Sequence, residues 1–568
     1  MPAKIWRLAQ ADPHTVSILQ NQLGIHPVFC QLLAQRGITS FDEARRFFRP
    51  DWAQLHDPFD MAGMDAAVPR LQRALAEGEG ILLYGDYDVD GTMGVSLLYD
   101  FLAKRGAKLD YYLPDRYSEG YGLSIEGVEY AHRKGLSLIV AIDCGIRDLA
   151  AARHAQRLGL DLIICDHHLP GSELPEAAAI LDPKRADCSY PYPELSGAGV
   201  AFKLAQALAR ATPAADERQE LEPLLDLLVI SIAADIVPLT GENRVLAHLG
   251  LERLNATERP GIKALAAQSR RQWPLRISDI VFGLAPRINA AGRLADAAQV
   301  VKLMLAADRE VAYHYAQVLD QRNQLRREFD RRTFEEAQAL WLADPDHPRR
   351  AAIVLYQPHW HKGVVGIVAS RMAEAFHKPA IILTQSDNRI VGSGRSAGTF
   401  DLHAALSLCE DVLINYGGHT HAAGLTLSNH WLPAFSDRFE GAAQALGRPE
   451  DKAPALDINA ELPLSQITPA FYRILRQFGP FGPGNPTPVF LARGVTDTGG
   501  ARRLQGDHLR IVVKQGDSDT FGGIAFNRGH ELEQLLRSPA FDLCFSLEEN
   551  HWKDQVSLQL MVKDVHFD

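Results

Sequence analysis

Three apolar runs that end in acidic residues or histidines constrain the fold more than any other feature of this sequence. The runs cover residues 80–84, 136–142 and 160–165, and Ala- and Leu-rich stretches typical of helices separate them. This alternation predicts βαβ units, in which parallel strands form a sheet with helices on both faces. The runs are followed by GDYDVDG at residues 85–91, DCG at 143–145 and DHH at 166–168. Because ligands bind outside the carboxyl ends of such strands, we expect a functional site at this edge.

The residue types at this edge favour a metal centre. Carboxylates gathered in one place repel each other, and divalent cations remove that repulsion. Oxygen-rich ligands with a little imidazole favour Mn²⁺ or Mg²⁺ over zinc. Two such ions about 3.5–4 Å apart would activate a water and hold the oxygens of a phosphoryl group. A calcium loop would need Glu six positions beyond Gly91, where Leu97 stands, and a P-loop would need a Gly-Lys-Ser/Thr ending that is missing.

Composition excludes some classes of protein. The 568 residues include 46% hydrophobic ones, which argues against a largely disordered chain and allows about three to five domains. We expect no membrane span, because even the most apolar stretch, residues 224–239, contains Asp226 and Asp235. We expect no secretory signal, because residues 1–20 contain no continuous apolar run. The six cysteines are widely spaced, which favours a reducing, cytoplasmic location. The net charge of −11 argues against a protein that coats nucleic acid through bulk charge.

The rest of the chain has a different character on each side of a long connector. The first fifty residues are typical of short helices. Residues 310–342 contain neither glycine nor proline and predict one long helix. A second α/β block follows, with strands expected at residues 351–356 and 379–384. After a Gly- and Pro-rich loop at residues 478–486, short alternating strands predict a small β-barrel or sandwich.

Ten motifs along the chain together resemble those of the DHH phosphoesterase superfamily, which is named for the triplet at residues 166–168. The motifs are GDYDVDGTMG, LPDRYSEGYGLS, AIDCGI, ICDHHLP, LSGAGVAFKL, AADIVPLTGENR, PRINAAGRL, GSGRS, GGHTHAAG and FGPFGPGNPTPVF. The resemblance implies an α/β fold class with two α/β lobes, a parallel-sheet DHH domain and a DHHA1 domain, joined by a long helix and followed by an all-β OB-fold. The implied division is a helical extension (1–50), DHH domain (51–295), connecting helix (296–348), DHHA1 domain (349–455) and OB-fold (456–568).

The resemblance also implies roles for individual residues. The implied metal ligands are Asp86, Asp88, Asp143, His167 and Asp235. Among them Asp143 is the bridging carboxylate, and His168 touches the scissile phosphate or orients the nucleophile. Asp90 and Asp166 are expected to support the site rather than bind metal. Tyr84 stands where some relatives carry an additional histidine ligand, which leaves the ligand count of the second ion open.

Phosphate contacts are implied on both sides of the connector. They are Arg116, Arg287, Ser393, Arg395 and His419, including contacts to a 5′-terminal phosphate. Arg287 and Arg293 are expected to flank a turn at residues 289–292, and Ser393 and Arg395 to lie in a turn at residues 392–396. His421 is interpreted as a packing residue at the start of a helix.

The resemblance implies a hydrolase, a two-metal, Mn²⁺- or Mg²⁺-dependent 5′→3′ exonuclease acting on single-stranded DNA in recombination and repair. It further implies single-strand-binding protein and a repair helicase as partners, and a monomer that does not associate with membranes. One alternative is a DHH phosphodiesterase acting on short RNA, cyclic nucleotides or phosphoanhydrides, although such relatives usually lack the helical extension and the OB-fold. Another is a non-catalytic replication scaffold, against which the intact acidic motifs argue.

Overall fold

The structure is a computed structural model that describes residues 4–116, 118–212, 216–294, 296–447, 455–552 and 555–567. The chain divides into two compact units. The larger unit comprises Ala9–Gln321 with Ile458–Asp568, and the smaller comprises Met1–Leu8 with Arg322–Asp457. Within the described ranges, no helix combines the length and the apolar character that a membrane span needs.

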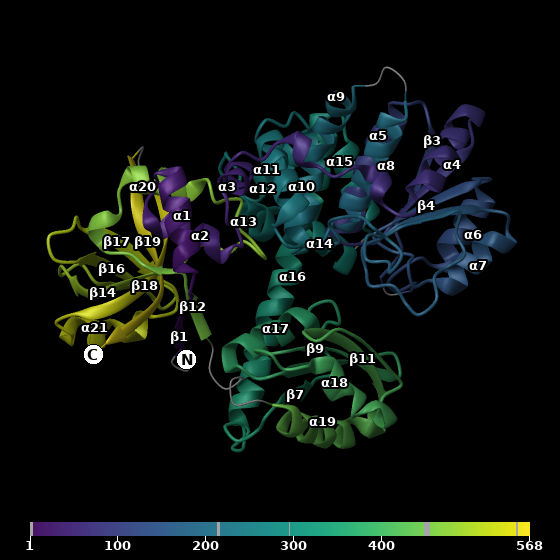
Figure 1. The fold of residues 1–568 in the computed structure, drawn as a ribbon. Coiled ribbons are helices and arrows are strands. Elements are labelled where there is room, and N and C mark those ends of the chain that lie inside the picture. The colour runs from purple at the N-terminus through teal and green to yellow at the C-terminus, as the bar shows by residue number, and fades with distance from the viewer. Residues whose placement is uncertain are drawn as a thin grey trace. The chain divides into compact units, whose positions relative to one another are not determined.

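The larger unit contains a five-stranded parallel sheet with helices packed around it (Figure 1). Its order is β3 (Lys108–Tyr112), β2 (Gly80–Gly85), β4 (Leu138–Ile142), β5 (Asp161–Cys165) and β6 (Ala179–Leu181). The three apolar runs of the sequence are therefore neighbouring central strands. Alternate side chains of each strand enter different cores: Ile81 and Leu83 join one cluster, whereas Leu82 and Tyr84 join another. Because both faces are buried, the strands are continuously apolar.

Helices cover both faces of this sheet. One core holds α4 (Met64–Glu77), α5 (Val89–Ala103), α8 (Gly197–Arg210) and α10 (Leu225–Ala234). The other core holds α6 (Ile125–Arg133) and α7 (Leu149–Arg157). Further helices of the unit are α9 (Glu217–Leu221), α11 (Gly241–Asn255), α12 (Pro260–Gln268), α13 (Ile277–Asp279), α14 (Ala285–Leu294) and α15 (Ala298–Leu305). A π-helical turn, Ile280–Leu284, precedes α14. Residues 289–292 lie within α14, so the turn expected there is wrong.

The C-terminal strands close into a barrel that shares its core with the N-terminal helices. The sheet order is β13 (Ala460–Glu461), β14 (Phe490–Asp497), β18 (Phe541–Trp552), β19 (Gln555–Phe567), β17 (Phe521–Ala525), β16 (His508–Lys514) and β15 (Arg502–Leu504). An additional pairing of β14 with β16 closes the barrel, which confirms the expected all-β domain. Helices α1 (Pro13–Leu23), α2 (Pro27–Gln35), α3 (Phe41–Phe48) and α20 (Pro469–Arg476) bury their apolar faces against it.

Most barrel aromatics fill the core. Phe521, Phe541 and Phe545 are buried, whereas Phe526 is 54% exposed and lies edge-on to His508. The side chain of Trp552 lies outside the described part of the structure. Of the aromatics described here, Phe526 is thus the one with an open face.

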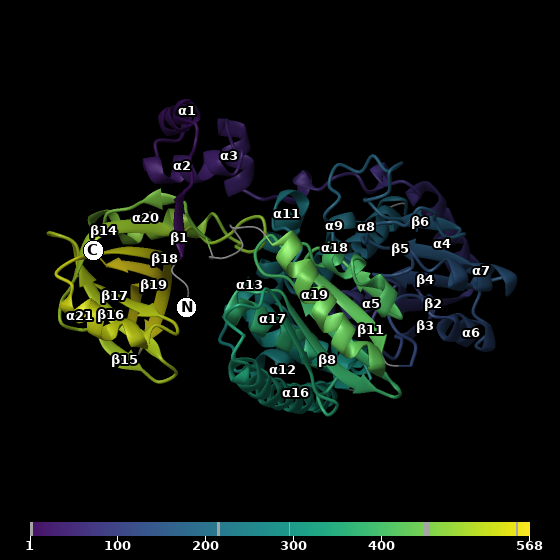
Figure 2. The same cartoon turned by 90° about the horizontal axis from the view of Figure 1, so that it is seen from below.

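The smaller unit contains the long helix and a five-stranded mixed sheet. Helix α16 (Arg309–Ala343) begins in the larger unit and continues into the smaller one, as the connector predicted. The sheet order is β10 (Asn415–Gly418), β11 (Ala422–Ser428), β9 (Arg389–Arg395), β8 (Ala380–Ser386) and β7 (Ile353–Tyr356). Figure 2 shows α19 (Leu432–Leu446) lying along this sheet with α18 (Leu402–Ser407), and α17 (Val365–Phe376) packs on the other face.

Two local expectations in this unit are wrong. Residues 392–395 belong to strand β9 rather than to a turn, because Gly392 and Gly394 pack against neighbouring elements: a Cβ on Gly392 would lie 2.6 Å from the carbonyl oxygen of Ile382. His421 does not begin a helix. It lies in the connection between β10 and β11, which follows Gly418, the last residue of β10, with a φ of +144°.

Candidate active site

Asp86 and Asp88 follow β2 in a tight loop. Asp86 is fully buried, and neither of its carboxylate oxygens has a hydrogen-bond partner among the described residues. Asp88 caps the N-terminus of α5, where its Oδ1 accepts hydrogen bonds from the backbone N–H of Asp90 at 2.8 Å and of Gly91 at 3.2 Å. A Cβ at position 91 would lie 2.4 Å from the backbone oxygen of Asp86, so only glycine allows this loop. The loop thereby holds two carboxylates at the sheet edge.

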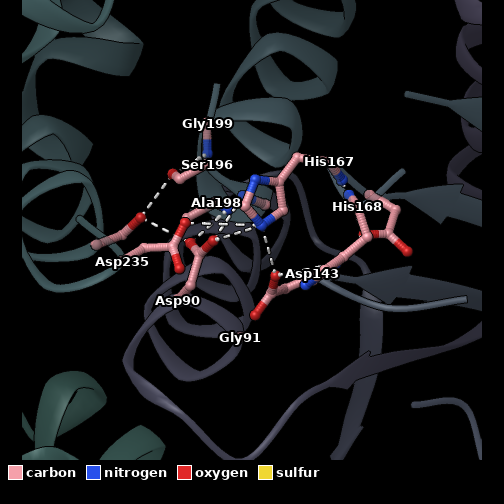
Figure 3. A network of polar contacts seen from close by, with 12 residues as sticks. Asp90, Gly91, Asp143, His167, His168, Ser196, Ala198, Gly199 and Asp235 are labelled. Carbon is pink, nitrogen blue, oxygen red and sulfur yellow. Dashed lines mark hydrogen bonds and ion pairs between the residues drawn. The ribbon is translucent and has the colours of Figure 1, made fainter. Parts of the chain in front are cut away.

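Asp143 and His167 extend the group from the next two strands. Asp143 directly follows β4 with a φ of +62°, a conformation that Asp and Asn tolerate better than most residues. The Nε2 of His167 lies 3.2 Å from Oδ1 of Asp143 and 3.6 Å from Oδ2 of Asp235 (Figure 3). Gly197 permits this packing, because a Cβ there would lie 2.5 Å from the Cβ of Asp143. Residues from three strand ends and from the end of one helix therefore lie close together at the edge of the sheet.

The five residues expected as ligands all belong to groups whose candidate ligand atoms lie within 4.8 Å of one another. The groups are Asp86, Asp88 and Asp143; Asp143, His167 and His168; and Asp90, His167 and Asp235. Asp143 and His167 each belong to two of these groups, so the three groups form one continuous cluster. The first three strand ends were identifiable from sequence periodicity, whereas Asp235, at the C-terminal end of α10, was implied only by the family resemblance.

The carboxylates of this site lie close together, and nearby positive charge offsets their repulsion only in part. Burial, together with repulsion between neighbouring carboxylates, raises the pKa of Asp86 and of Asp143 well above the ordinary value, and the same causes act on Asp235. Burial also lowers the pKa of His167, which keeps the imidazole neutral and able to bind a metal. Within the described ranges, no Lys or Arg forms an ion pair with Asp86 or Asp143. Buried carboxylate oxygens without donors are what a site for hard divalent cations needs, so these residues fit Mn²⁺ or Mg²⁺.

The carboxylates of Asp90 and Asp166 accept hydrogen bonds from groups of the protein itself. Asp90 accepts a hydrogen bond from the N–H of Ala198 at 2.8 Å (Figure 3). It also accepts hydrogen bonds from the N–H of Gly197 at 2.6 Å and the hydroxyl of Ser231 at 2.7 Å, so that Asp90 joins α5, α8 and α10. Burial by itself would raise the pKa of Asp166. However, hydrogen bonds from His168 and backbone amides outweigh burial and lower that pKa to about 2. Both carboxylates thus fix the geometry of the loops that carry the candidate ligands.

Tyr84 does not face the acidic group. It is fully buried in the core beneath α6, where its hydroxyl donates to the carbonyl of Gly122 at 2.9 Å and accepts from the N–H of Ser124 at 3.1 Å. A Cβ on Gly127 would lie 2.3 Å from the Tyr84 ring, so the ring is tightly enclosed. The position where some relatives have a ligand therefore serves packing in this chain.

His168 is held at both ring nitrogens. Its Nδ1 lies 2.7 Å from Oδ1 of Asp166, and its Nε2 lies 2.8 Å from the hydroxyl of Tyr121. Sequence reasoning missed Tyr121. The available signal was an aromatic residue between Gly120 and Gly122, in a loop that follows a strand end.

Arg116 and Arg287 have different surroundings. The Arg116 guanidinium lies 5.1 Å from the ring centre of Tyr87, the residue next to Asp86. Its positive charge offsets part of the burial and carboxylate repulsion that raise the pKa of Asp86. Arg287 is largely buried: it donates to Asp320, to the carbonyl of Gly283 and to the carbonyl of Gln268. Arg287 therefore ties α14 to α12 and to the start of α16, and contact with a phosphate stays a prediction for it.

Ser393, Arg395 and His419 lie in the smaller unit. Ser393 and Arg395 point to the same side of β9, beside the N-terminus of α17: a Cβ on Gly366 would lie 3.2 Å from Nη2 of Arg395 and 3.3 Å from Oγ of Ser393. Backbone N–H groups at a helix N-terminus together with a guanidinium suit a phosphate. His419 is exposed in the neighbouring connection, and the carbonyl of His421 accepts a hydrogen bond from Ser396 N–H at 3.0 Å.

Family models match three parts of the chain: the DHH family N-terminal domain (residues 80–232), the DHHA1 domain (350–447) and the RecJ OB domain (458–564). The chain is 37% identical over 565 residues to the single-stranded-DNA-specific exonuclease RecJ of Salmonella typhimurium, and the match covers 95% of this chain and 96% of that protein. The chain belongs to the RecJ family. The RecJ of Bacillus subtilis is 36% identical over 563 residues, covering 98% of this chain and 70% of that protein.

Solved RecJ structures share the fold. The RecJ of Thermus thermophilus in complex with Mn²⁺ has a TM-score of 0.84 and 30% identity, and the match covers 99% of this chain and 80% of that one. The same RecJ in complex with Mg²⁺ has a TM-score of 0.78. An exonuclease RecJ bound to manganese matches 71% of this chain with 34% identity and a TM-score of 0.60. The two α/β units and the barrel are thus the architecture of a RecJ protein.

Proposed function

We propose that this protein is a metal-dependent exonuclease that hydrolyses phosphodiester bonds of single-stranded DNA from the 5′ end. The observation that carries the proposal is the group of buried, unpartnered carboxylate oxygens at the sheet edge, in a chain of the RecJ family. The cofactor is Mn²⁺ or Mg²⁺, and the reaction is a hydrolysis. The 5′→3′ direction and a site with two ions are the finer parts of the proposal.

Asp86, Asp88, Asp143, His167 and Asp235 would hold the metal. When bound, divalent ions in such a site lower the pKa of a water and neutralise charge on the phosphate. The chain itself supplies orientation. Asp90 and Asp166 fix the loops that carry the ligands, through the hydrogen bonds described above. Asp166 and Tyr121 hold the ring of His168, so its orientation toward a phosphate oxygen or the nucleophile is set in advance.

We propose that phosphate contacts extend from both units. Arg116, beside Asp86, would bind a phosphate near the scissile bond, and Arg287 another on the same unit. Ser393, Arg395 and His419 would bind the 5′-terminal phosphate, because backbone amides of α17 and a guanidinium converge there. Capture of a terminal phosphate at a fixed site would make cleavage start from that end.

A nuclease assay with end-labelled substrates tests the function. With Mn²⁺, the enzyme should degrade a 5′-phosphorylated single strand, spare a blunt duplex and act poorly on a short RNA. Faster cleavage of the short RNA or of a cyclic dinucleotide would instead support the small-substrate alternative. Equal rates on a strand blocked at its 5′ end and on one tethered at its 3′ end would contradict the direction.

The remaining proposals concern organisation and cellular context. We propose the five-part division at residues 50, 295, 348 and 455 as working boundaries, supported by the order of the matched domains. We further propose a cytoplasmic monomer that acts in recombination and repair with single-strand-binding protein and a repair helicase. Light scattering at several protein concentrations tests the monomer, and co-purification with each partner tests the associations.

A further inference from the structure

A loop that leads into the barrel packs directly on the chain segment that follows Asp235. The loop comprises residues 478–486, and the segment, residues 236–240, connects α10 to α11. Pro483 accepts a hydrogen bond from the N–H of Leu239 at 2.7 Å. A Cβ on Gly482 would lie 2.7 Å from Cδ1 of Leu239. The loop therefore contacts the chain at Leu239, four residues after the candidate metal ligand Asp235.

Gly484 makes the second close approach. It has a φ of +70°, and a Cβ there would lie 2.9 Å from Cγ2 of Thr240 and 3.3 Å from Cβ of Pro238. Two glycines with no room for a side chain hence face the 236–240 segment. The close packing opposes movement of the segment toward the loop, and the hydrogen bond from Leu239 opposes movement away from it.

The shape of the loop is fixed by Asn485. This residue is 1% exposed, and its amide donates to the carbonyls of Phe478 at 2.8 Å and Pro480 at 2.9 Å. Its Oδ1 accepts a hydrogen bond from Nε of Arg36 at 2.8 Å. Arg244 of α11 donates to the carbonyl of Gly479 at 2.8 Å, which connects the loop directly to α11.

The 236–240 segment needs such support. Ile236 has a φ of +63°, a strained conformation for a β-branched residue, and its side chain is 65% exposed. Strain of this kind persists only where the surroundings impose it. Ile236 is adjacent to Asp235, so relaxation of its backbone would displace the carboxylate that lies 3.6 Å from Nε2 of His167.

We propose that the 478–486 loop positions Asp235 for metal binding, so that Gly482, Gly484 and Asn485 are positioning residues of the metal site. The inference rests on the proposed function, because it takes Asp235 as a ligand. The loop would act on Asp235 indirectly, through its contacts with residues 238–240.

Calorimetric titration of the full-length, metal-free protein with Mn²⁺ alone tests the proposal. Gly484→Ala should weaken Mn²⁺ binding about 10-fold, as is usual when the support of a ligand is lost. The matched control is Gly494→Ala in β14. That glycine has a φ of +61° but open space around its Cβ position, so the variant carries similar backbone strain and should bind Mn²⁺ normally. Equal weakening in both variants would overturn the proposal.

Two further variants separate the proposal from a general loss of structure. Thr240→Ser removes the methyl group that the new Cβ would meet and keeps the hydroxyl, which lies 3.2 Å from that of Tyr192. Adding it to Gly484→Ala should recover most of the Mn²⁺ affinity. Gly482→Ala, which has no positive φ, is a second probe that should weaken binding in the same direction.

A double-mutant cycle with Asp235→Asn distinguishes this inference from the proposed metal site. Asp235→Asn alone should weaken Mn²⁺ binding, and Gly484→Ala should have no additional effect in that background. Full additivity of the two losses would overturn positioning through Asp235. Unchanged Mn²⁺ binding in Asp235→Asn would instead contradict the ligand assignment itself.

Discussion

The hydroxyl of Tyr121 lies 2.8 Å from Nε2 of His168, while Asp166 lies 2.7 Å from Nδ1 of the same ring. The imidazole is therefore held between an anion and a phenol. Its proximity to Asp166 has a further effect: although burial lowers the pKa of His168, the bond to this carboxylate and its charge raise the pKa above the ordinary histidine value. A ring held in this way favours the protonated form, in which Nδ1–H donates to Asp166 and Nε2–H donates to the hydroxyl oxygen of Tyr121.

Tyr121→Phe should lower kcat about 10-fold, because it removes one of the two groups that orient the ring. KM should change little. Steady-state kinetics on a 5′-phosphorylated single strand measure both quantities. Tyr130→Phe is the control, since that hydroxyl bonds Asp110 at 2.8 Å and plays no part in the site. An equal loss of kcat in both variants would contradict the role of Tyr121.

Asp143→Asn should change stability in opposite directions with and without metal. In metal-free protein the substitution removes a buried carboxylate whose pKa is raised by burial and by neighbouring carboxylates, so the melting temperature should rise. Asn also tolerates the φ of +62°. With Mn²⁺ present, the wild type should gain more stability than the variant, and turnover in the variant should be lost. Thermal unfolding at matched Mn²⁺ concentrations measures both effects. A lower melting temperature in metal-free Asp143→Asn would contradict the claim that burial and repulsion at Asp143 destabilise the metal-free protein.

Asp182 should make stability fall as pH rises toward neutrality. It is fully buried, and burial raises its pKa from 3.8 to about 7. Between these two values the folded state binds one more proton than the unfolded state, so the free energy of unfolding decreases as pH rises. The contribution of Asp182 to the free energy of unfolding is therefore fully present below pH 3.8 and is lost as the pH rises through about 7.

Asp182→Asn should remove this part of the pH dependence. Urea unfolding of wild type and variant at several pH values measures the difference in free energy of unfolding, which should shift in favour of the variant as pH rises to about 7. A difference that does not vary with pH would show that Asp182 is ionised in the folded protein.

Arg395→Gln should raise KM for a 5′-phosphorylated strand about 10-fold or more, the usual cost of losing a charged hydrogen bond to a phosphate. KM for a strand with a 5′-hydroxyl should change far less. Arg389→Gln is the control, because Arg389 is exposed at the opposite end of the same strand. Equal effects on both substrates would contradict recognition of the terminal phosphate by Arg395.

The sequence was sufficient for the central sheet and most of its acidic edge. Asp86, Asp143 and His167 follow apolar strands, and parallel strands place their carboxyl ends on one edge whatever the intervening helices are. Asp235 comes from the end of a helix distant in the chain, so no local pattern could place it. Tyr121 was missed for the same reason, because its partner His168 lies 47 residues away.

Glycines explain the local errors. In GSGRS and in NAAG they were interpreted as turn formers, yet the structure uses them for close packing within a strand and a helix. A Cβ on Gly394 would lie 2.6 Å from Cδ1 of Ile381, and one on Gly292 would lie 2.5 Å from the carbonyl oxygen of Tyr87. Whether a glycine serves conformation or packing depends on distant residues, which periodicity does not reveal.

The close approach at Gly91 and Gly197 has a consequence for any screen of variants. Neither residue carries a functional group, yet a side chain at either position would collide with Asp86 or Asp143. In a saturation library scored by nuclease activity, these two positions should therefore be as intolerant as the carboxylates themselves. A screen that measures only intolerance to substitution would therefore classify Gly91 and Gly197 as catalytic residues. Their actual role is to leave room for Asp86 and Asp143.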